Sequence, residues 1–333
     1  MSSTRGKILV IRGGAIGDFI LTLPAIVALR QQFPEAHLEV LGYPHIVQLA
    51  EAGGLVNRVQ AIEARGLAAF FARNGELSEE LCDYFSEFNI IVSYLYDPDE
   101  IFKTNLARCS RAQFIVGPHR PDEAARLHAT EVFLKPLERL AIFDADPVPH
   151  LSLVVEESAK THALTIAIHP GSGSERKNWP GARWTELFQD LINRFKFNLL
   201  LVGGEAEGDQ LTSYARFLPE DRVRIARSLP LKELARQLKE CAGFIGHDSG
   251  ITHLAAAVGL PTLALWAETN VNIWRPLGNN VVILQGETGI TSLAVGRVLE
   301  QVASLGHAKR FEPDSTQVLR WRATTQPEQL AGD

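Results

Sequence analysis

The stretch Gly243–Trp266, GFIGHDSGITHLAAAVGLPTLALW, decides the fold of the chain. It begins with a short apolar run that is typical of a buried strand, and the polar residues His247–Gly250 follow at once. The Ala-rich segment Leu254–Val258 favours a helix, which Gly259 and Pro261 then end. The pattern therefore predicts a strand, a sharp turn, a helix and a second strand, as in a βαβ unit of a parallel sheet.

The turn of this unit is unusually rich in polar side chains. Free backbone N–H groups and the positive end of a helix dipole attract anions at such a position. An ordinary βαβ unit needs a single N-cap, and Asp248 or Ser249 would serve as one. The polar residues within about one turn of each other are His247, Asp248, Ser249, Thr252 and His253. Their density favours an anion-binding site over a simple cap.

Strand-like and helix-like segments alternate on both sides of a break near Phe143–His162. Before it we expect strands at Lys7–Arg12, Leu38–Leu41, Asn57–Ile62, Phe88–Leu95 and Gln113–Val116, and helices at Asp18–Phe33 and Arg126–Ile142. After it we expect strands at Thr165–Ile168, Asn198–Val202, Arg222–Ile225 and Val281–Leu284, and helices at Gly181–Phe195, Leu231–Lys239 and Leu293–Leu305. This alternation predicts an α/β fold of two Rossmann-like domains that face a cleft.

We place the two domains at residues 1–150 and 151–306. For the polar tail, residues 307–333, the sequence leaves two alternatives: a return across the first domain, or disorder. Because ligands of such folds bind beyond the carboxyl ends of the strands, the cleft between the domains is the expected binding place.

Composition narrows the class of protein. The chain has 333 residues, of which 46% are hydrophobic and 22% charged, with a net charge of −6, as in a soluble globular protein. An acidic chain argues against a nucleic-acid partner. Cys82, Cys109 and Cys241 are too few and too far apart for a disulfide framework or a metal-binding motif. The start of the chain does not resemble a signal peptide, and no apolar run is long enough to span a bilayer, so we expect a cytoplasmic location.

Two further segments carry groups that could act chemically. Glycines precede Asp18 in Gly13–Asp18, so a ligand can approach the backbone closely there. Asp18 is either a helix cap or a general base at the edge of the sheet. In the loop His169–Pro180, HPGSGSERKNWP, Ser172 can hydrogen-bond phosphate oxygens and Lys177 can neutralise their charge, unless Lys177 is simply a solvated surface residue.

A third segment, Gly203–Glu205, follows a strand directly. An acid at this position often binds the hydroxyl groups of a ribose, although Glu205 would equally favour a helix dipole. Phosphate loop, acid and helix N-terminus together form the parts of one nucleotide site.

These segments resemble glycosyltransferase family 9, the bacterial heptosyltransferases of lipopolysaccharide core assembly. The resemblance runs from about Lys7 to Val302, through the motifs IRGGAIGDFILTLP, HPGSGSERKNWP, LLLVGGEAEGD and GHDSGITHLAAAVGLPTLALW. It implies the GT-B architecture, with the acceptor on the N-terminal domain and the nucleotide-sugar on the C-terminal domain.

The resemblance also implies roles for individual residues. Asp18 matches the catalytic base, and Lys177 matches the lysine that contacts the donor phosphates. The other donor-binding positions are Ser172 and Gly173 at the diphosphate, Glu205 at the ribose, Leu229 at the adenine, and Asp248, Ser249, Gly250 and His253 in the turn. One departure is Trp266–Asn270, where the family commonly has Phe-Gly-Pro-Thr-Asp, and another is His247, where Asn is frequent.

We therefore expect an inverting glycosyltransferase that moves a sugar, heptose by resemblance, from an ADP-sugar to a hydroxyl of a saccharide acceptor such as lipopolysaccharide core. No cofactor and no obligatory metal are expected, because Lys177 and the helix N-terminus can stabilise the leaving diphosphate. The alternatives are a nucleotide-sugar epimerase or hydrolase on the same fold and a non-catalytic nucleotide-binding protein.

The expected acceptor is anionic and lipid-linked, with peripheral contact at the cytoplasmic face of the membrane. This expectation comes from a locally basic region that comprises Lys103, Arg108, Arg111, Arg120 and Arg126. Basic residues of this kind also form ordinary solvated faces.

Overall fold

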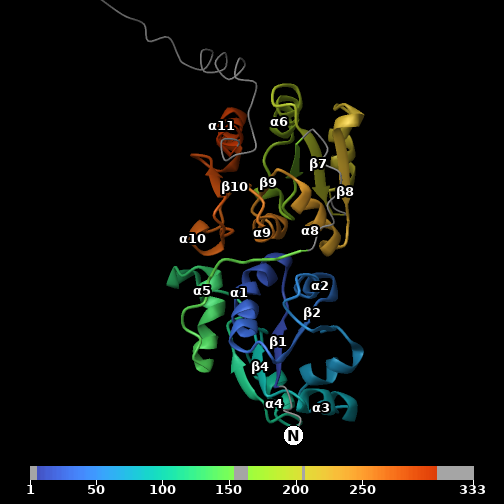
Figure 1. The fold of residues 1–333 in the computed structure, drawn as a ribbon, viewed down its shortest axis with the longest axis vertical. Coiled ribbons are helices and arrows are strands. Elements are labelled where there is room, and N and C mark those ends of the chain that lie inside the picture. The colour runs from blue at the N-terminus through green and yellow to red at the C-terminus, as the bar shows by residue number, and fades with distance from the viewer. Residues whose placement is uncertain (1–5, 154–163, 205–206, 306–333) are drawn as a thin grey trace, which may run out of the picture.

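The computed structural model describes residues 6–153, 164–204 and 207–305. Within them the chain forms two parallel sheets, one above the other in Figure 1. The first has the order β3-β2-β1-β4-β5, with β1 (Lys7–Arg12), β2 (His37–Gly42), β3 (Arg58–Ala61), β4 (Ile90–Ser93) and β5 (Gln113–Val116). Its helices are α1 (Ile16–Gln32), α2 (Pro44–Ala52), α3 (Glu79–Ser86), α4 (Ile101–Leu106) and α5 (Ala129–Leu134), with 3₁₀ turns η1 (Arg65–Phe71), η2 (Glu123–Ala125) and η3 (Lys135–Leu140).

The second sheet has the order β11-β10-β9-β6-β7-β8. Its strands are β6 (Thr165–His169), β7 (Asn198–Gly203), β8 (Val223–Arg227), β9 (Gly243–His247), β10 (Thr262–Trp266) and β11 (Val281–Gln285). Its helices are α6 (Gly181–Asn193), α7 (Gly208–Ala215), α8 (Leu231–Glu240), α9 (Gly250–Ala257), α10 (Val271–Trp274) and α11 (Val295–Leu305), with 3₁₀ turns η4 (Glu175–Lys177), η5 (Glu220–Arg222) and η6 (Ile290–Ser292). All pairings in both sheets are parallel, which confirms the predicted pair of Rossmann-like folds.

The strand order places the quoted motifs at the switch points of the two sheets. In the first sheet the chain leaves β1 in one direction, towards β2 and β3, and returns to its other side with β4. In the second sheet β6 and β9 are related in the same way. Ligands of open α/β sheets bind at these points. The segments after β1, β6 and β9 carry Asp18, Lys177 and Asp248.

A buried core joins the two halves. Phe19 of α1 and Leu254 of α9 belong to one contiguous cluster of buried side chains, and α1 and α9 face each other where the two lobes meet in Figure 1. Two further clusters of buried hydrophobic side chains each belong to one half: one packs within the second half and the other within the first half. The chain crosses between the lobes after η3, where the N–H of Leu151 donates to the carbonyl of Ala257 at 2.8 Å. The boundary at residue 150 stays a prediction, and the tail, residues 307–333, lies outside the described residues.

One predicted helix is wrong in its extent. The segment Arg126–Ile142 forms the short helix α5 followed by the 3₁₀ turn η3. Pro136 has no N–H to donate to an α-helical ladder, so the α-helix ends at Leu134.

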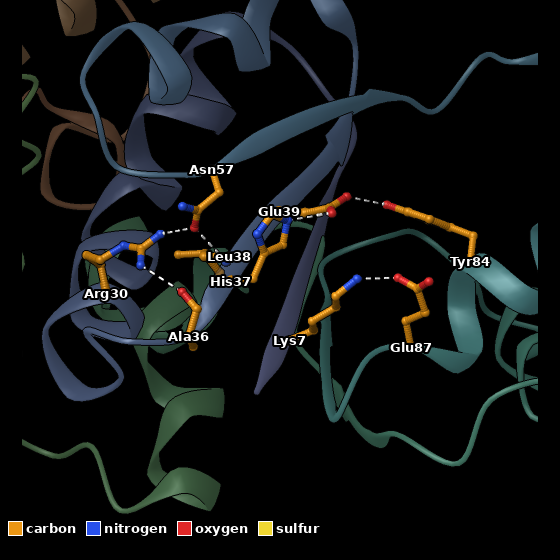
Figure 2. Close-up of polar contacts among 9 residues, drawn as sticks. All are labelled: Lys7, Arg30, Ala36, His37, Leu38, Glu39, Asn57, Tyr84 and Glu87. Carbon is orange, nitrogen blue, oxygen red and sulfur yellow. Dashed lines mark hydrogen bonds and ion pairs between the residues drawn. The ribbon is translucent and has the colours of Figure 1, made fainter. Parts of the chain in front are cut away.

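Hydrogen bonds and ion pairs join the amino ends of β1 and β2 to neighbouring segments, far from the switch point (Figure 2). The buried carboxylate of Glu39 accepts from the hydroxyl of Tyr84 at 2.9 Å and lies 2.8 Å from Nε2 of His37. Lys7 pairs with Glu87 across the same edge. Burial and the nearby Glu39 raise the pKa of Tyr84, which keeps its hydroxyl protonated as a donor. This network therefore stabilises the amino ends of the strands, whereas the candidate functional residues lie at the carboxyl ends.

Candidate active site

A cleft of about 1110 Å³ opens between the carboxyl edges of the two sheets. We call it the main cleft. From the first half it receives side chains that follow β1, β4 and β5, and from the second half side chains that follow β6, β9 and β10. Of the predicted site residues it is lined by Asp18, Ser172, Lys177, Asp248, Ser249, Gly250 and His253. The structure thus brings most of the predicted residues to one place.

Asp18 both supports its helix and faces the main cleft. It is the third residue of α1, and its Oδ2 accepts the N–H of Ala15 at 3.0 Å, which satisfies one of the free donors at the helix start. The other oxygen, Oδ1, lies 3.7 Å from the guanidinium of Arg12. The side chain is still 27% exposed, so it can meet a ligand in the cleft. Both sequence-based interpretations, cap and base, are compatible with this geometry.

Arg12 holds the backbone around Asp18 in place through hydrogen bonds. This last residue of β1 is buried, and its guanidinium donates to the carbonyls of Tyr94, His119 and Asp18 at 3.4, 2.9 and 3.3 Å. It also lies 4.5 Å from the ring centre of Phe133, close enough for a cation–π contact. Arg12 therefore fixes three segments of the cleft wall relative to the carboxylate.

The loop after β6 is held by a neutral histidine. Burial lowers the pKa of His247 to about 4. Its Nε2 accepts the N–H of Trp179 at 2.8 Å, so the ring hydrogen is on Nδ1, which donates to the carbonyl of Gly171 at 3.3 Å. Trp179 donates in turn to the carbonyl of Leu293 at 2.9 Å. His247 thus fixes both ends of the segment that presents Ser172 and Lys177.

Lys177 and Asp248 form an ion pair inside the main cleft. The distance from Nζ to Oδ2 is 2.6 Å, and the two side chains are 33% and 9% exposed. Lys177 is therefore directed into the cleft rather than solvated on the surface. A cation in this position is suited to the charge of a diphosphate.

The start of α9 presents backbone rather than side-chain donors to the cleft. Ser249 is the N-cap residue, but its side chain makes no capping bond; its Oγ lies 3.2 Å from Nδ1 of His169 and from the hydroxyl of Thr252. The first N–H groups of α9 therefore lack a side-chain acceptor from the N-cap, as an anion site requires. Burial lowers the pKa values of His169 and His253 to about 4, so both rings are neutral near pH 7.

Two predicted donor residues do not line this cleft. Gly173 is exposed, with φ of +70°, a conformation that favours glycine. Leu229 follows β8 and packs half-buried against the shared core. Glu205 lies outside the described residues. Of the five basic residues, only Arg120 lines the main cleft, while Lys103 pairs with Glu100 on the distant helix α4.

Several residues of the cleft wall were not predicted. They include Arg12, Tyr96, His119 and Trp274. The ring centres of Tyr96 and His119 are 4.6 Å apart, and the guanidinium of Arg120 lies 5.3 Å from the ring centre of Trp274, which joins the two halves. Arg12 ends β1, and Tyr96 and His119 follow β4 and β5 closely, so their position at strand ends is the sequence signal that could have found them; Trp274 ends helix α10 and has no such signal.

Acidic pairs away from the cleft have structural partners. In the sequence Asp97-Pro98-Asp99, Asp97 accepts from the N–H groups of Phe102 and Lys103 at the start of α4, and Asp99 pairs with Arg73 at 3.1 Å. Neither lines the main cleft. In the described part of the chain there is no group of three or more His, Cys, Asp or Glu side chains arranged to hold a metal ion. The same residues include no helix with the length and apolar character of a membrane span.

Comparison with known proteins adds independent findings. The model of glycosyltransferase family 9 (heptosyltransferase) matches residues 128–296. A putative glycosyltransferase of Haemophilus influenzae is 24% identical over 302 residues, which cover 82% of this chain and 86% of the relative. Lipopolysaccharide heptosyltransferase 3 of Escherichia coli is 22% identical over 299 residues, 80% of this chain and 85% of the relative.

One solved structure shares the arrangement of both halves. The structure of ADP-heptose LPS heptosyltransferase II of Escherichia coli matches with a TM-score of 0.73 at 18% identity, over 90% of this chain and 98% of that chain. At this level of identity the likeness concerns the fold, and it confirms the predicted GT-B architecture.

Proposed function

Because the chain belongs to glycosyltransferase family 9, we propose that it transfers a heptose from ADP-heptose to a hydroxyl of a lipopolysaccharide core saccharide. The observation that carries this proposal is the convergence of Asp18, Lys177 and the start of α9 on one cleft. A carboxylate, a cation and free backbone donors are the three kinds of group that glycosyl transfer to a hydroxyl requires.

The proposed reaction inverts the configuration at the anomeric carbon. Asp18 accepts the proton of the acceptor hydroxyl as its oxygen attacks that carbon, through an oxocarbenium-like transition state. The bond between the anomeric carbon and the phosphate oxygen breaks, and its electron pair leaves with ADP. The product side therefore holds a new glycosidic bond, protonated Asp18 and the free nucleotide.

Lys177 and the N-terminus of α9 stabilise the charge of the departing diphosphate. Lys177 is paired with Asp248 in the structure, so it is already oriented in the cleft before a donor arrives. We propose that these groups make a divalent metal ion unnecessary. Ser172, whose hydroxyl contacts Asn178 at 2.6 Å, lies at the same edge and is assigned to the diphosphate.

The choice of ADP and heptose comes from the names of the relatives. The departure Trp266–Asn270 bears on the sugar, because Glu268, Thr269 and Asn270 line the main cleft. Trp266 is buried and donates to the carbonyl of Thr269 at 2.6 Å, which fixes the shape of this segment. We assign this segment to contacts with the transferred sugar or the acceptor.

The acceptor is proposed to be anionic and lipid-linked, with the enzyme at the cytoplasmic face of the membrane. Arg120 supports an anionic acceptor, because its guanidinium reaches the main cleft. Flotation with anionic liposomes at low salt tests the membrane contact, and the absence of any bound protein would count against it.

A thermal-shift panel with ADP, UDP, GDP and dTDP tests the nucleotide. At a hundred times its dissociation constant, the true ligand should add about 2.7 kcal/mol of stability. We expect stabilisation by ADP in the presence of EDTA. Stabilisation by no nucleotide, or only with Mg²⁺, would contradict the site. Product analysis then separates transfer from its alternatives, since an epimerase or a hydrolase yields an epimer or a free sugar without an acceptor.

A further inference from the structure

The short helix α10 and the segment before it form one wall of the main cleft. The residues that line the cleft from this wall are Glu268, Thr269, Asn270 and Trp274. With the four residues Val271–Trp274, α10 makes a single turn. Because so short a helix is not stable by itself in water, the position of this wall depends on contacts with its surroundings.

Two contacts connect α10 to the first half of the chain. In Figure 1 the helix lies just above α5, where the two lobes meet. The guanidinium of Arg120 lies 5.3 Å from the ring centre of Trp274. Next to it, Nε2 of the buried His128 lies 2.9 Å from the carbonyl oxygen of Arg275, the residue that ends α10. A side chain and a backbone group at the end of α10 therefore both meet the first half.

His128 donates a hydrogen bond to Arg275 because its ring is neutral. Burial lowers the pKa of this ring, so it carries no charge near pH 7. Its Nδ1 lies 2.9 Å from the hydroxyl of Thr130 and accepts the N–H of that residue at 3.3 Å, which caps helix α5. The ring hydrogen is therefore on Nε2, which donates to the carbonyl of Arg275. One nitrogen thus caps α5, and the other holds the end of α10.

Helix α5, which begins after His128, is fixed relative to Asp18. It packs against α1, the helix that carries Asp18. Phe133 of α5 and Phe19 of α1 belong to the same buried cluster. The hydroxyl of Tyr94 also donates to the carbonyl of Phe133 at 2.6 Å. A well-packed connection therefore runs from Asp18 through α1 and α5 to His128.

We propose that His128 is a positioning residue, whose bond to Arg275 fixes the wall formed by α10 relative to the carboxylate of Asp18. This inference rests on the proposed transfer, in which the wall contacts the sugar or the acceptor and Asp18 accepts the proton. A misplacement of about 1 Å can lower the rate of an enzyme about 10²-fold. Loss of the bond should therefore lower kcat. ADP binding should not change, because Lys177 and the start of α9 do not depend on this bond.

Two substitutions of His128 separate this role from simple capping of α5. In His128→Asn the side-chain oxygen can replace Nδ1 as the cap, since Asn is among the best capping residues, but the side chain is too short to reach Arg275. In His128→Gln the amide nitrogen can replace Nε2 as the donor to Arg275, whereas the cap is weakened. A capping role alone predicts normal turnover in His128→Asn and a lower melting temperature in His128→Gln.

The experiment measures turnover with ADP-heptose and a lipopolysaccharide core saccharide, and ADP affinity by calorimetry. We expect kcat to fall about 10- to 100-fold in His128→Asn and to stay within about threefold of the wild type in His128→Gln. The ADP affinities of the three proteins should agree. Wild-type turnover in His128→Asn would overturn the positioning role, and so would an equal loss of turnover in both variants.

Hydrogen exchange of the amides in Glu268–Trp274, measured without ligand, tests the contact independently of catalysis. Faster exchange in His128→Asn, but not in His128→Gln, would support the role of the bond to Arg275. Equal exchange in all three proteins would overturn it. If the wild type transfers no heptose, the proposed function fails, and the exchange data still decide whether His128 holds α10.

Discussion

The ammonium group of Lys177 lies 2.6 Å from the carboxylate of Asp248, so two residues predicted to bind the donor are paired with each other. The diphosphate therefore enters a site whose cation already has a partner. Asp248 is largely buried, and its charge is stabilised by this cation. The pair keeps Lys177 directed into the main cleft while leaving part of its surface available to phosphate oxygens.

Lys177→Ala should weaken ADP binding by about 1.5–3 kcal/mol, the scale of a hydrogen bond to a charged group. The variant also leaves Asp248 near the diphosphate without its cation, which adds to the loss. Arg176→Ala is the matched control, because Arg176 is an exposed cation of the same loop that lines the same cleft. Calorimetry with ADP should show a clearly smaller effect for Arg176→Ala. Equal effects would mean that only the net charge of the loop matters.

Gly250→Ala should separate the two helix ends. The added Cβ meets the backbone nitrogen of Gly17 at 2.9 Å, and neither helix can move without shifting buried residues. We expect a loss of about 1–3 kcal/mol of unfolding free energy and a lower kcat, because Asp18 moves away from the donor turn. Gly296→Ala is the control: no atom lies within 4 Å of its added Cβ, and alanine favours helix α11. The test measures denaturant unfolding and turnover of both variants. Unchanged turnover in Gly250→Ala would contradict the close contact of the two helix ends.

Acid should destabilise the protein through its buried histidines. Burial lowers the pKa of His247, His169 and His253 from 6.5 to about 4. In the unfolded chain these rings take up protons below pH 6.5, whereas in the folded chain they stay neutral until about pH 4. The folded state therefore binds fewer protons in this window, and the free energy of unfolding falls as the pH is lowered from about 6.5 to about 4.

His247→Asn offers a direct check of this pH dependence. The Asn side chain does not titrate, and its amide nitrogen can take the place of the ring Nδ1 as donor to the carbonyl of Gly171. Melting temperatures between pH 4.5 and 7.5 should fall less steeply for this variant than for the wild type. An identical slope would show that His247 does not contribute to the acid sensitivity.

Local sequence patterns were sufficient for most of the fold. The strands Lys7–Arg12 and Gln113–Val116 were predicted to the residue, because apolar runs flanked by polar turns define buried parallel strands. Because the carboxyl ends of parallel strands meet at one edge, the position of Asp18, Lys177 and Asp248 near one another also followed from the sequence. The helix predicted at Arg126–Ile142 shows the limit of local patterns. Helical spacing predicted one continuous helix, whereas in the structure Pro136 interrupts it.

Contacts between distant segments could not be predicted from local patterns. The bonds of His247 to Trp179 and Gly171 join residues far apart in the chain, and the tight approach of Gly250 to Ile16 joins the two halves. The position of Arg120 in the cleft, apart from the other basic residues, depends on where the loop after β5 runs.

Asp18→Asn should separate the capping role of Asp18 from its proposed chemistry. Asn keeps the size of the side chain, and its oxygen can still accept the N–H of Ala15, so the melting temperature should change little. It cannot take up the acceptor's proton, and the loss of a general base typically lowers the rate about 10²- to 10⁴-fold. ADP affinity should stay close to that of the wild type, because Lys177 and the start of α9 belong to the other half. Turnover and ADP binding are measured on the same preparation. Near-normal turnover would refute the catalytic assignment, whereas loss of both turnover and ADP binding would show that Asp18 instead keeps the two halves in register.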